Sequence, residues 1–175
     1  MTSPEFTDPQ AIACDAADAI RFRLSLTSVD MGLVLGSGWS AGVDRLGETL
    51  GRIPLGALPG FSAPVVAGHG GDLVAVALPT GKTAVVLTGR THFYEGRGVE
   101  SVVHGVRTVA ALGATTMILT NGCGGLDPSW GPGTVVAIRD HINLTGTTPL
   151  RGATFIDMST AWTPSLLKVV EKVAP

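Results

Sequence analysis

The stretch "TAVVLTGRTHFYEG" (residues 83–96) decides the fold that we expect from the sequence. Its first six residues are a short, largely apolar run. An arginine, a histidine, a tyrosine and a glutamate then follow between two glycines. A short apolar run bounded by turn residues is typical of a strand that is buried on both faces. A turn needs only the glycines, so the polar side chains at the end of this strand require another explanation.

The same pattern recurs along the chain, between segments with helical spacing. Apolar runs predict further buried strands over residues 33–35, 72–78, 115–121 and 132–138, and residues 79–81 are expected to join two strands as a hairpin. Helices are predicted from Pro9 with Asp8 as cap, over residues 101–112 before Gly113, and from Pro164 with Thr163 as cap. Apolar strands alternating with helices indicate an α/β protein with a largely parallel or mixed sheet, in a single domain over residues 1–175.

The composition argues against a nucleic-acid partner. Of 175 residues, 45% are apolar and only 15% are charged, and the formal net charge is -2. The only lysines are Lys82, Lys168 and Lys172, so no basic cluster exists that could follow a phosphate backbone. The low charged share fits either a large core with doubly buried strands or a subunit that covers surface against copies of itself.

The cysteines and the N-terminus suggest a cytoplasmic protein without a membrane segment. Cys14 and Cys123 lie far apart in the sequence and have neither metal-ligand nor redox spacing, so we expect reduced thiols. The first ten residues, "MTSPEFTDPQ", lack the basic and then apolar order of a signal peptide. No apolar run is long enough to span a membrane.

Three of the predicted strands end in unusual loops, at residues 36–38, 89–96 and 121–125. If these strands are parallel neighbours, the loops face one crevice, because ligands bind beyond the carboxyl ends of strands in α/β sheets. The glycines let backbone N–H groups approach an anion, and Ser37 adds a hydroxyl donor. Arg90 supplies a planar fork for phosphate oxygens, and His92 supplies a further donor. Together these groups point to a site for a small anion.

Each of these features also has a structural interpretation, which stays open at this point. A Gly-Ser-Gly stretch is a common turn, and a single arginine on a loop is usually a solvated charge. His104 lies in a predicted helix and His141 at the end of a predicted strand, so we interpret both as structural. Cys123 is interpreted as a small packed residue.

Five motifs together resemble one known family, the trimeric purine nucleoside phosphorylases of low molecular mass. They are "LVLGSGWS", "VAGHGG", "LTGRTHFYEG", "ILTNGCGGL" and "IRDHINLTGTTPL", in the family's order and spacing, and "TNGCGGL" is similar to the actinobacterial form. The resemblance implies a nucleoside phosphorylase fold, with a central mixed sheet flanked by helices. It also implies a pentosyltransferase that converts purine ribonucleosides or deoxyribonucleosides and phosphate into the free base and the sugar 1-phosphate. Inorganic phosphate is the co-substrate, with no further cofactor and no metal.

The resemblance also assigns a phosphate site, residue by residue. Ser37, Arg90 and His92 match the family's phosphate-binding side chains, and His69 matches the histidine of the loop that closes over phosphate. The backbone N–H of Gly122 matches another phosphate contact, although many relatives have alanine at this position.

Three further residues receive supporting roles from the same resemblance. Tyr94 matches the tyrosine that lies against the sugar, and Glu95 matches the glutamate that supports the phosphate-binding loops. Asn121 begins the glycine loop, and its side chain is expected to organise that turn. The resemblance makes Ser37, Arg90, His92 and Glu95 the catalytic set.

Members of this family continue well past position 175, so the resemblance implies that the C-terminal strands and the residues that grip the purine are absent. The base and the 5′ substituent that this protein prefers therefore stay open. Thr160 and Trp162 also depart from the family, which usually has aspartate and tyrosine there. The alternatives are a methylthioadenosine phosphorylase and an inactive phosphate-binding fragment; the phosphate ligands argue against a nucleoside hydrolase. A homotrimer is expected, with the chain just after Arg151 contributing to a neighbouring site.

Overall fold

A computed structural model describes residues 8–36, 38–62 and 71–174 of the chain. Its internal contacts separate two compact units, Met1–Gly122 and Cys123–Pro175, and each is described by itself. The single domain expected for residues 1–175 stays a prediction.

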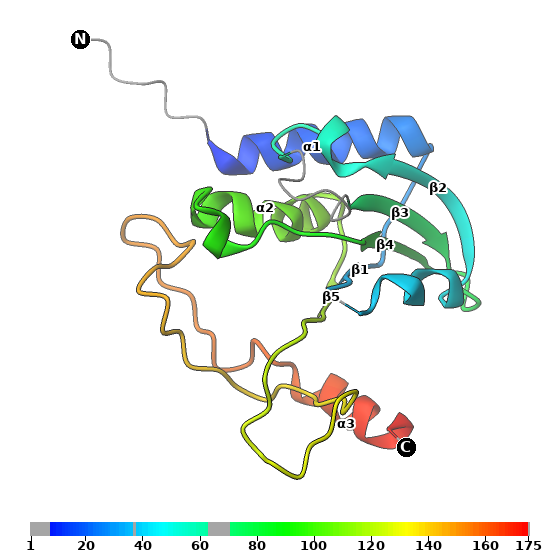
Figure 1. The fold of residues 1–175 in the computed structure, drawn as a ribbon. Coiled ribbons are helices and arrows are strands. Elements are labelled where there is room, and N and C mark those ends of the chain that lie inside the picture. The colour runs from blue at the N-terminus through cyan, green and yellow to red at the C-terminus, as the bar shows by residue number, and fades with distance from the viewer. Residues whose placement is uncertain (1–7, 37, 63–70, 175) are drawn as a thin grey trace. The chain divides into compact units, whose positions relative to one another are not determined.

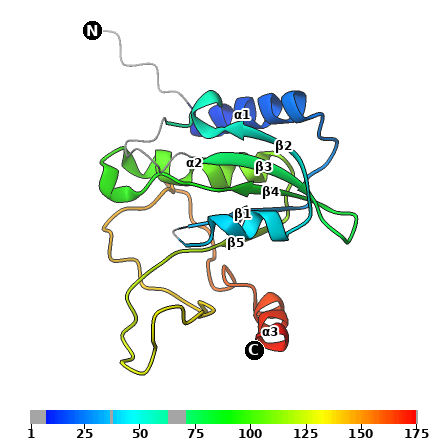
Figure 2. The ribbon, with the colours of Figure 1, turned by 45° about the vertical axis from the view of Figure 1, so that its right-hand side comes forward.

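The first unit is built on a mixed sheet of five strands in the order β2-β3-β4-β1-β5 (Figures 1 and 2). The strands are β1 (Met31–Val34), β2 (Glu48–Pro54), β3 (Asp72–Ala77), β4 (Thr83–Leu87) and β5 (Thr116–Leu119). Strands β4, β1 and β5 are parallel to one another, whereas β2 and β3 run antiparallel to their neighbours. The predicted mixed sheet, the hairpin of β3 and β4, and the strands near residues 33 and 116 are confirmed.

Strand β2 was not predicted, and its burial explains why. It lies at one edge of the sheet, and only Ile53 among its seven residues is buried. An edge strand with exposed polar positions has no continuous apolar run, so the pattern that revealed the central strands is missing from "ETLGRIP".

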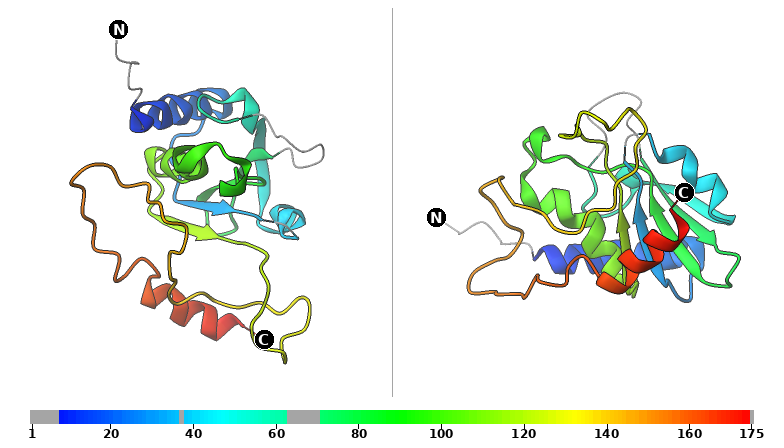
Figure 3. Two further views of the ribbon diagram at one scale, coloured as in Figure 1. Left: turned by 60° about the vertical axis from the view of Figure 1, so that its left-hand side comes forward. Right: turned by 90° about the horizontal axis from the view of Figure 1, so that it is seen from below.

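Two helices, α1 (Pro9–Leu24) and α2 (Gly98–Ala111), pack against each other beside the sheet (Figure 3). The Asp8 carboxylate accepts a hydrogen bond from the backbone N–H of Gln10 at 3.0 Å, which confirms the predicted cap of α1. Helix α2 ends before Gly113, whose φ of +95° is the left-handed conformation expected of a glycine after a helix.

The central strands β1, β3 and β4 are buried on both faces, as their apolar runs predicted. Strand β5 was also predicted to be buried, but it lies at an edge of the sheet and its Ile118 and Leu119 are exposed. One cluster joins Leu73 and Val85 of the sheet to Ile20 of α1 and Val109 of α2. The residues that point the other way form a second cluster with Val43 of the short 3-10 helix η1 (Ser40–Arg45). Alternate residues of one strand thus enter different cores, so a shift of one residue in register would exchange the two sets.

The second unit contains one helix, α3 (Pro164–Val173), drawn in red in Figure 3, which begins after Thr163 as predicted. The strand predicted over residues 132–138 is wrong. Val135 and Val136 are exposed, and in the described part of this unit no backbone pairs with that run. A strand needs a hydrogen-bonding neighbour, and an apolar run without one does not form a sheet.

His104 has the structural role that its place in a helix indicated. It is buried, its Nε2 donates a hydrogen bond to the carbonyl oxygen of Pro59 at 2.9 Å, and its ring meets the ring of Phe61 edge-on at 4.5 Å. Burial lowers the pKa of His104, the charge of Arg107 acts in the same direction, and the hydrogen bond to Pro59 opposes both.

We expect this lowered pKa to make stability depend on pH. The unfolded chain takes up a proton near pH 6.5, whereas folded His104 stays neutral until lower pH, so stability is complete above about pH 6.5 and declines as the pH falls. Urea unfolding from about pH 7.5 to about pH 5 should show this decline. In His104→Gln, which keeps an N–H donor, it should be smaller. His141→Gln, at an exposed histidine, should retain the wild-type decline, and an equal loss of the decline in both variants would contradict the assignment.

Gly32 in β1 leaves room for Val109 of α2 and for the Met117 side chain of the neighbouring strand β5. A Cβ at this position would overlap the Val109 side chain and lie 2.6 Å from Sδ of Met117. We therefore expect Gly32→Ala to lower the free energy of unfolding by about 1–3 kcal/mol, measured by urea denaturation. Gly42→Ala is the matched control, because a Cβ at Gly42 meets no atom within 4 Å. Equal stability of the two variants would contradict this account.

Candidate functional site

The candidate site lies at the edge of the sheet where β4, β1 and β5 end together. Val34, the last residue of β1, is in register with Leu87 of β4 and with Leu119 of β5. The loops that begin at Gly36, Gly89 and Asn121 therefore leave from one edge, as the sequence predicted for parallel neighbours (Figure 1). Ser37 and His69, both expected to bind phosphate, lie outside the described residues.

Thr120 joins the end of β5 to the end of β1. Its Oγ1 donates a hydrogen bond to the carbonyl oxygen of Val34 at 2.9 Å and accepts one from the backbone N–H of Gly36, also at 2.9 Å. The backbone N–H of Thr120 donates to the same Val34 oxygen at 2.9 Å. Two of these hydrogen bonds hold the end of β1, and the third holds Gly36, the first residue of the loop that follows it.

Arg90 lies directly against Gly36. A Cβ at Gly36 would overlap the Arg90 guanidinium and would lie 2.8 Å from the carbonyl oxygen of Thr120. Arg90 is half-buried, and within the described part of the chain no oxygen accepts a hydrogen bond from its guanidinium. A half-buried cation with unused donors is suited to bind an anion.

The rest of the loop after β4 is held by Glu95. Its Oε1 accepts a hydrogen bond from the backbone N–H of His92 at 2.7 Å, and its Oε2 lies 3.5 Å from Nε of Arg97. Both carboxylate oxygens are thus engaged by the loop itself. This arrangement lets Glu95 fix the loop between Arg90 and Gly96 and leaves the cationic end of the site without a competing carboxylate.

His92 and Tyr94 present a pair of rings on the same loop. The rings stack with centroids 4.8 Å apart and an interplanar angle of 14°, and Tyr94 is 82% exposed. The exposed ring of Tyr94, stacked on His92, offers a flat surface on the same loop as Arg90. Asn121 and Gly122, expected in the same site, are exposed directly after Thr120.

Sequence analysis missed two threonines that hold the site together, Thr88 and Thr120. Thr88 follows β4 as Thr120 follows β5. Its Oγ1 accepts a hydrogen bond from the backbone N–H of Asp72 at 2.9 Å and lies 3.2 Å from the carbonyl oxygen of the same residue. The signal was present in the sequence, because "LTG" and "LTN" each place a leucine and a threonine directly before a polar loop.

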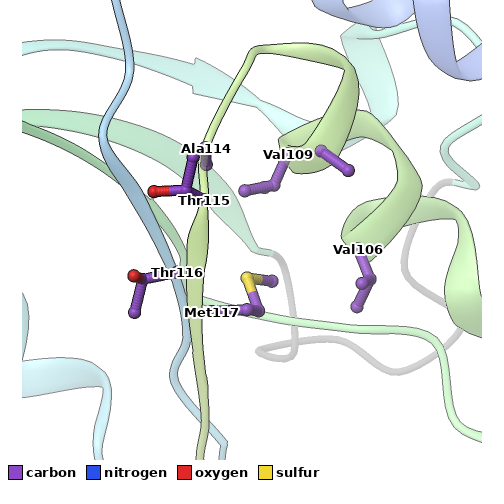
Figure 4. A pocket seen from close by; sticks show the side chains of 7 residues that line it. Val106, Val109, Ala114, Thr115, Thr116 and Met117 are labelled. Atoms are coloured by element: carbon purple, nitrogen blue, oxygen red, sulfur yellow. The ribbon is translucent and has the colours of Figure 1, made fainter. Parts of the chain in front are cut away.

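A separate cavity of about 100 Å³ lies between α2 and β5 (Figure 4). It is lined by apolar side chains that include Val106, Val109 and Met117, together with Thr115 and Thr116 at the start of β5. The candidate loops leave from the opposite end of this strand, so the cavity is not part of the anion site.

Two absences limit the chemistry of the described residues. Across residues 8–36, 38–62 and 71–174, no group of three or more histidine, cysteine or acidic side chains could hold a metal ion. No helix in these ranges is both long and apolar enough to cross a membrane. Cys14 and Cys123 are free and exposed, so Cys123 is not the packed residue that the sequence suggested.

The fold and the loops define an α/β protein with a candidate anion site where parallel strands end. Residues 30–175 match the Phosphorylase superfamily, and the chain belongs to this family. The five motifs indicated a resemblance to purine nucleoside phosphorylases. Relatives that bear this name confirm the resemblance.

The purine nucleoside phosphorylase of Cellulomonas sp is 49% identical over 173 residues, which are 97% of this chain and 61% of that protein. The purine nucleoside phosphorylase of Mycobacterium leprae is 42% identical over 168 residues, which are 96% of this chain and 62% of that protein. The chain thus spans about three fifths of the length of these relatives.

Among solved structures, isoform 2 of purine nucleoside phosphorylase from Schistosoma mansoni, in complex with cytosine and ribose-1-phosphate, has a TM-score of 0.81 and 32% identity. The match covers 94% of this chain and 60% of that chain. The purine nucleoside phosphorylase of the same organism in complex with inosine has a TM-score of 0.80 and 30% identity. This match covers 94% of the present chain and 60% of that chain. The nucleoside phosphorylase fold expected from the motifs is confirmed.

The contact of Arg90 with Gly36 leads to a prediction for anion binding. A methyl group in Gly36→Ala would displace the guanidinium, so we expect the Kd for inorganic phosphate to rise roughly tenfold by calorimetry. Gly42→Ala, which also adds one methyl group but lies in η1 and meets no atom within 4 Å, should bind phosphate as the wild type does. An unchanged Kd in Gly36→Ala would show that this contact does not position an anion-binding group.

Proposed function

We propose that this protein is a purine nucleoside phosphorylase. It would convert a purine ribonucleoside or deoxyribonucleoside and phosphate into the free base and the sugar 1-phosphate. The relatives bear that name, and solved relatives hold ribose-1-phosphate, inosine or adenosine. The single observation that carries the proposal is the half-buried Arg90 guanidinium, seated on Gly36 at the common end of three parallel strands.

In this proposal the phosphate is bound by groups from several loops. They are the side chains of Ser37, His69, Arg90 and His92 and the backbone N–H of Gly122. Hydrogen bonds to a charged group contribute about 1.5–3 kcal/mol each, so three or four of them hold a phosphate firmly. Inorganic phosphate is the co-substrate, and no other cofactor or metal is required.

The sugar is bound beside the phosphate. Tyr94 lies against it, which agrees with the exposure of that ring and its stacking on His92. Glu95 supports the loop through its hydrogen bond to the His92 backbone, and Asn121 organises the glycine loop after β5. Ser37, Arg90, His92 and Glu95 form the catalytic set.

The chemistry follows from the charge that develops when a glycosidic bond breaks. The sugar gains positive charge in the transition state, as in glycoside hydrolysis. A phosphate held beneath the anomeric carbon stabilises this charge and is oriented to attack the carbon as the purine departs. The residues near Arg90 supply the phosphate side of this reaction, and groups that bind the purine are expected from the part of the family's length that this chain does not span.

Two alternatives and two further expectations belong to the proposal. A methylthioadenosine phosphorylase would use the same phosphate site, and an inactive fragment would keep only anion affinity. We further propose a homotrimer in the cytoplasm, with residues after Arg151 completing a neighbouring site. The low charged share of the sequence, 15%, supports an assembly that covers surface.

Calorimetry with phosphate, followed by an assay of hypoxanthine release from inosine, tests the proposal. We expect phosphate to bind to the wild type. Arg90→Gln should lower the affinity for phosphate at least about tenfold, because the variant loses the positive charge and the paired N–H donors of the guanidinium. Arg45→Gln is the control, since it removes an exposed arginine at the end of η1.

The outcomes separate the alternatives. Release of hypoxanthine only when phosphate is present supports the phosphorylase, whereas release without phosphate contradicts it. Phosphate binding without turnover supports the fragment. Equal weakening of phosphate binding in Arg90→Gln and Arg45→Gln would contradict the site.

A further inference from the structure

We infer that Thr120 is a positioning residue of the phosphate site. The Thr120 hydroxyl fixes the position of Gly36, and Gly36 in turn fixes the position of the Arg90 guanidinium that packs against it. This inference rests on the proposed phosphate site, because its effect is read as a change in phosphate affinity. Thr120 itself does not contact the anion.

The hydrogen-bonding capacity of the Thr120 hydroxyl is used on both sides. Its hydrogen points to the carbonyl oxygen of Val34, and its oxygen accepts the N–H of Gly36, both at 2.9 Å. The Val34 oxygen also receives the backbone N–H of Thr120. Loss of the hydroxyl therefore leaves Val34 with a donor but leaves the part-buried N–H of Gly36 without its acceptor.

The N–H of Gly36 is consequently directed into the protein and is not itself an anion donor. Its bond to Thr120 fixes the direction in which the chain leaves β1. On its other side, Gly36 lies against Arg90, and the carbonyl oxygen of Thr120 lies 2.8 Å from the position that a Gly36 Cβ would take. Thr120 therefore bounds the space in which Arg90 and Gly36 meet, and movement of Gly36 displaces the guanidinium.

Not every backbone group at this end of the sheet depends on a threonine hydroxyl. Val34 ends β1 and is followed by Leu35, whose backbone N–H is satisfied by the carbonyl oxygen of Leu87 at 2.8 Å. Side-chain hydroxyls appear after β4 and β5, where a polar loop begins. At Thr120 the bonded partner, Gly36, itself contacts the Arg90 guanidinium, which has no hydrogen-bond acceptor among the described residues.

Thr108 in α2 provides a matched control for replacing threonine with valine. It is fully buried, and its Oγ1 has no hydrogen-bond partner among the described residues. Thr108→Val therefore makes the same change of shape and polarity in the same unit, without removing a hydrogen bond.

The test compares Thr120→Val, Thr120→Ser and Thr108→Val by phosphate calorimetry, urea unfolding and hydrogen exchange of the Gly36 amide. We expect Thr120→Val to weaken phosphate binding roughly tenfold and to speed exchange at Gly36. Thr120→Ser keeps the hydroxyl and should restore the wild-type Kd to within about threefold. Thr108→Val should leave both the Kd and the Gly36 exchange unchanged.

The results distinguish failure of this inference from failure of the proposed function. If the wild type binds no inorganic phosphate, both the proposed site and the inference are overturned. If the wild type binds phosphate and folded Thr120→Val binds it equally well, Thr120 only stabilises the strand end and the inference alone is wrong. Equal weakening in Thr120→Ser and Thr120→Val also overturns it, because the hydroxyl would then not be the group that matters.

Discussion

The rest of the structure depends on the parallel register of β4, β1 and β5. Val34, Leu87 and Leu119 are in register, so the three strands end at the same edge of the sheet. The backbone N–H and C=O groups just beyond these ends no longer pair within the sheet and need other hydrogen-bond partners. Thr120 satisfies those groups beside β1, and Thr88 does so beside β3. The side chains that satisfy these backbone groups thus also order the loops that form the proposed anion site.

Glycine has a defined steric function at this edge. Gly36 lies between a guanidinium and a carbonyl oxygen, at distances that leave no room for a side chain. Gly71, next to β3, approaches the backbone of Gly89 in the same way, since a Cβ at Gly71 would lie 2.8 Å from Gly89 N. Loops from different strands can come together here only because neither contact carries a Cβ.

The sequence predicted the parts of the molecule whose pattern is local or whose partners lie inside the first unit. Helix α1 was predicted from Asp8 and its alanines, and the central strands from apolar runs that are buried on both faces. Strand β2 was missed because an edge strand carries polar residues, and the strand over residues 132–138 was wrongly predicted because an apolar run does not reveal whether a partner exists. Thr88 and Thr120 were missed because their hydrogen bonds join residues 16 and 84–86 positions apart.

The placement of charge would allow an acidic protein to bind the phosphate that we propose. The formal net charge is -2, so the chain as a whole offers no general attraction for phosphate. Locally, however, the nearest carboxylate on the loop, that of Glu95, is occupied by the His92 backbone and by Arg97. Arg90 keeps its donors because no acidic partner among the described residues binds them. A half-buried cation without a partner among the described residues has an unfavourable solvation energy. The proposed oxyanion would relieve that cost as well as form hydrogen bonds, and this would favour a small, compact anion over a dispersed one.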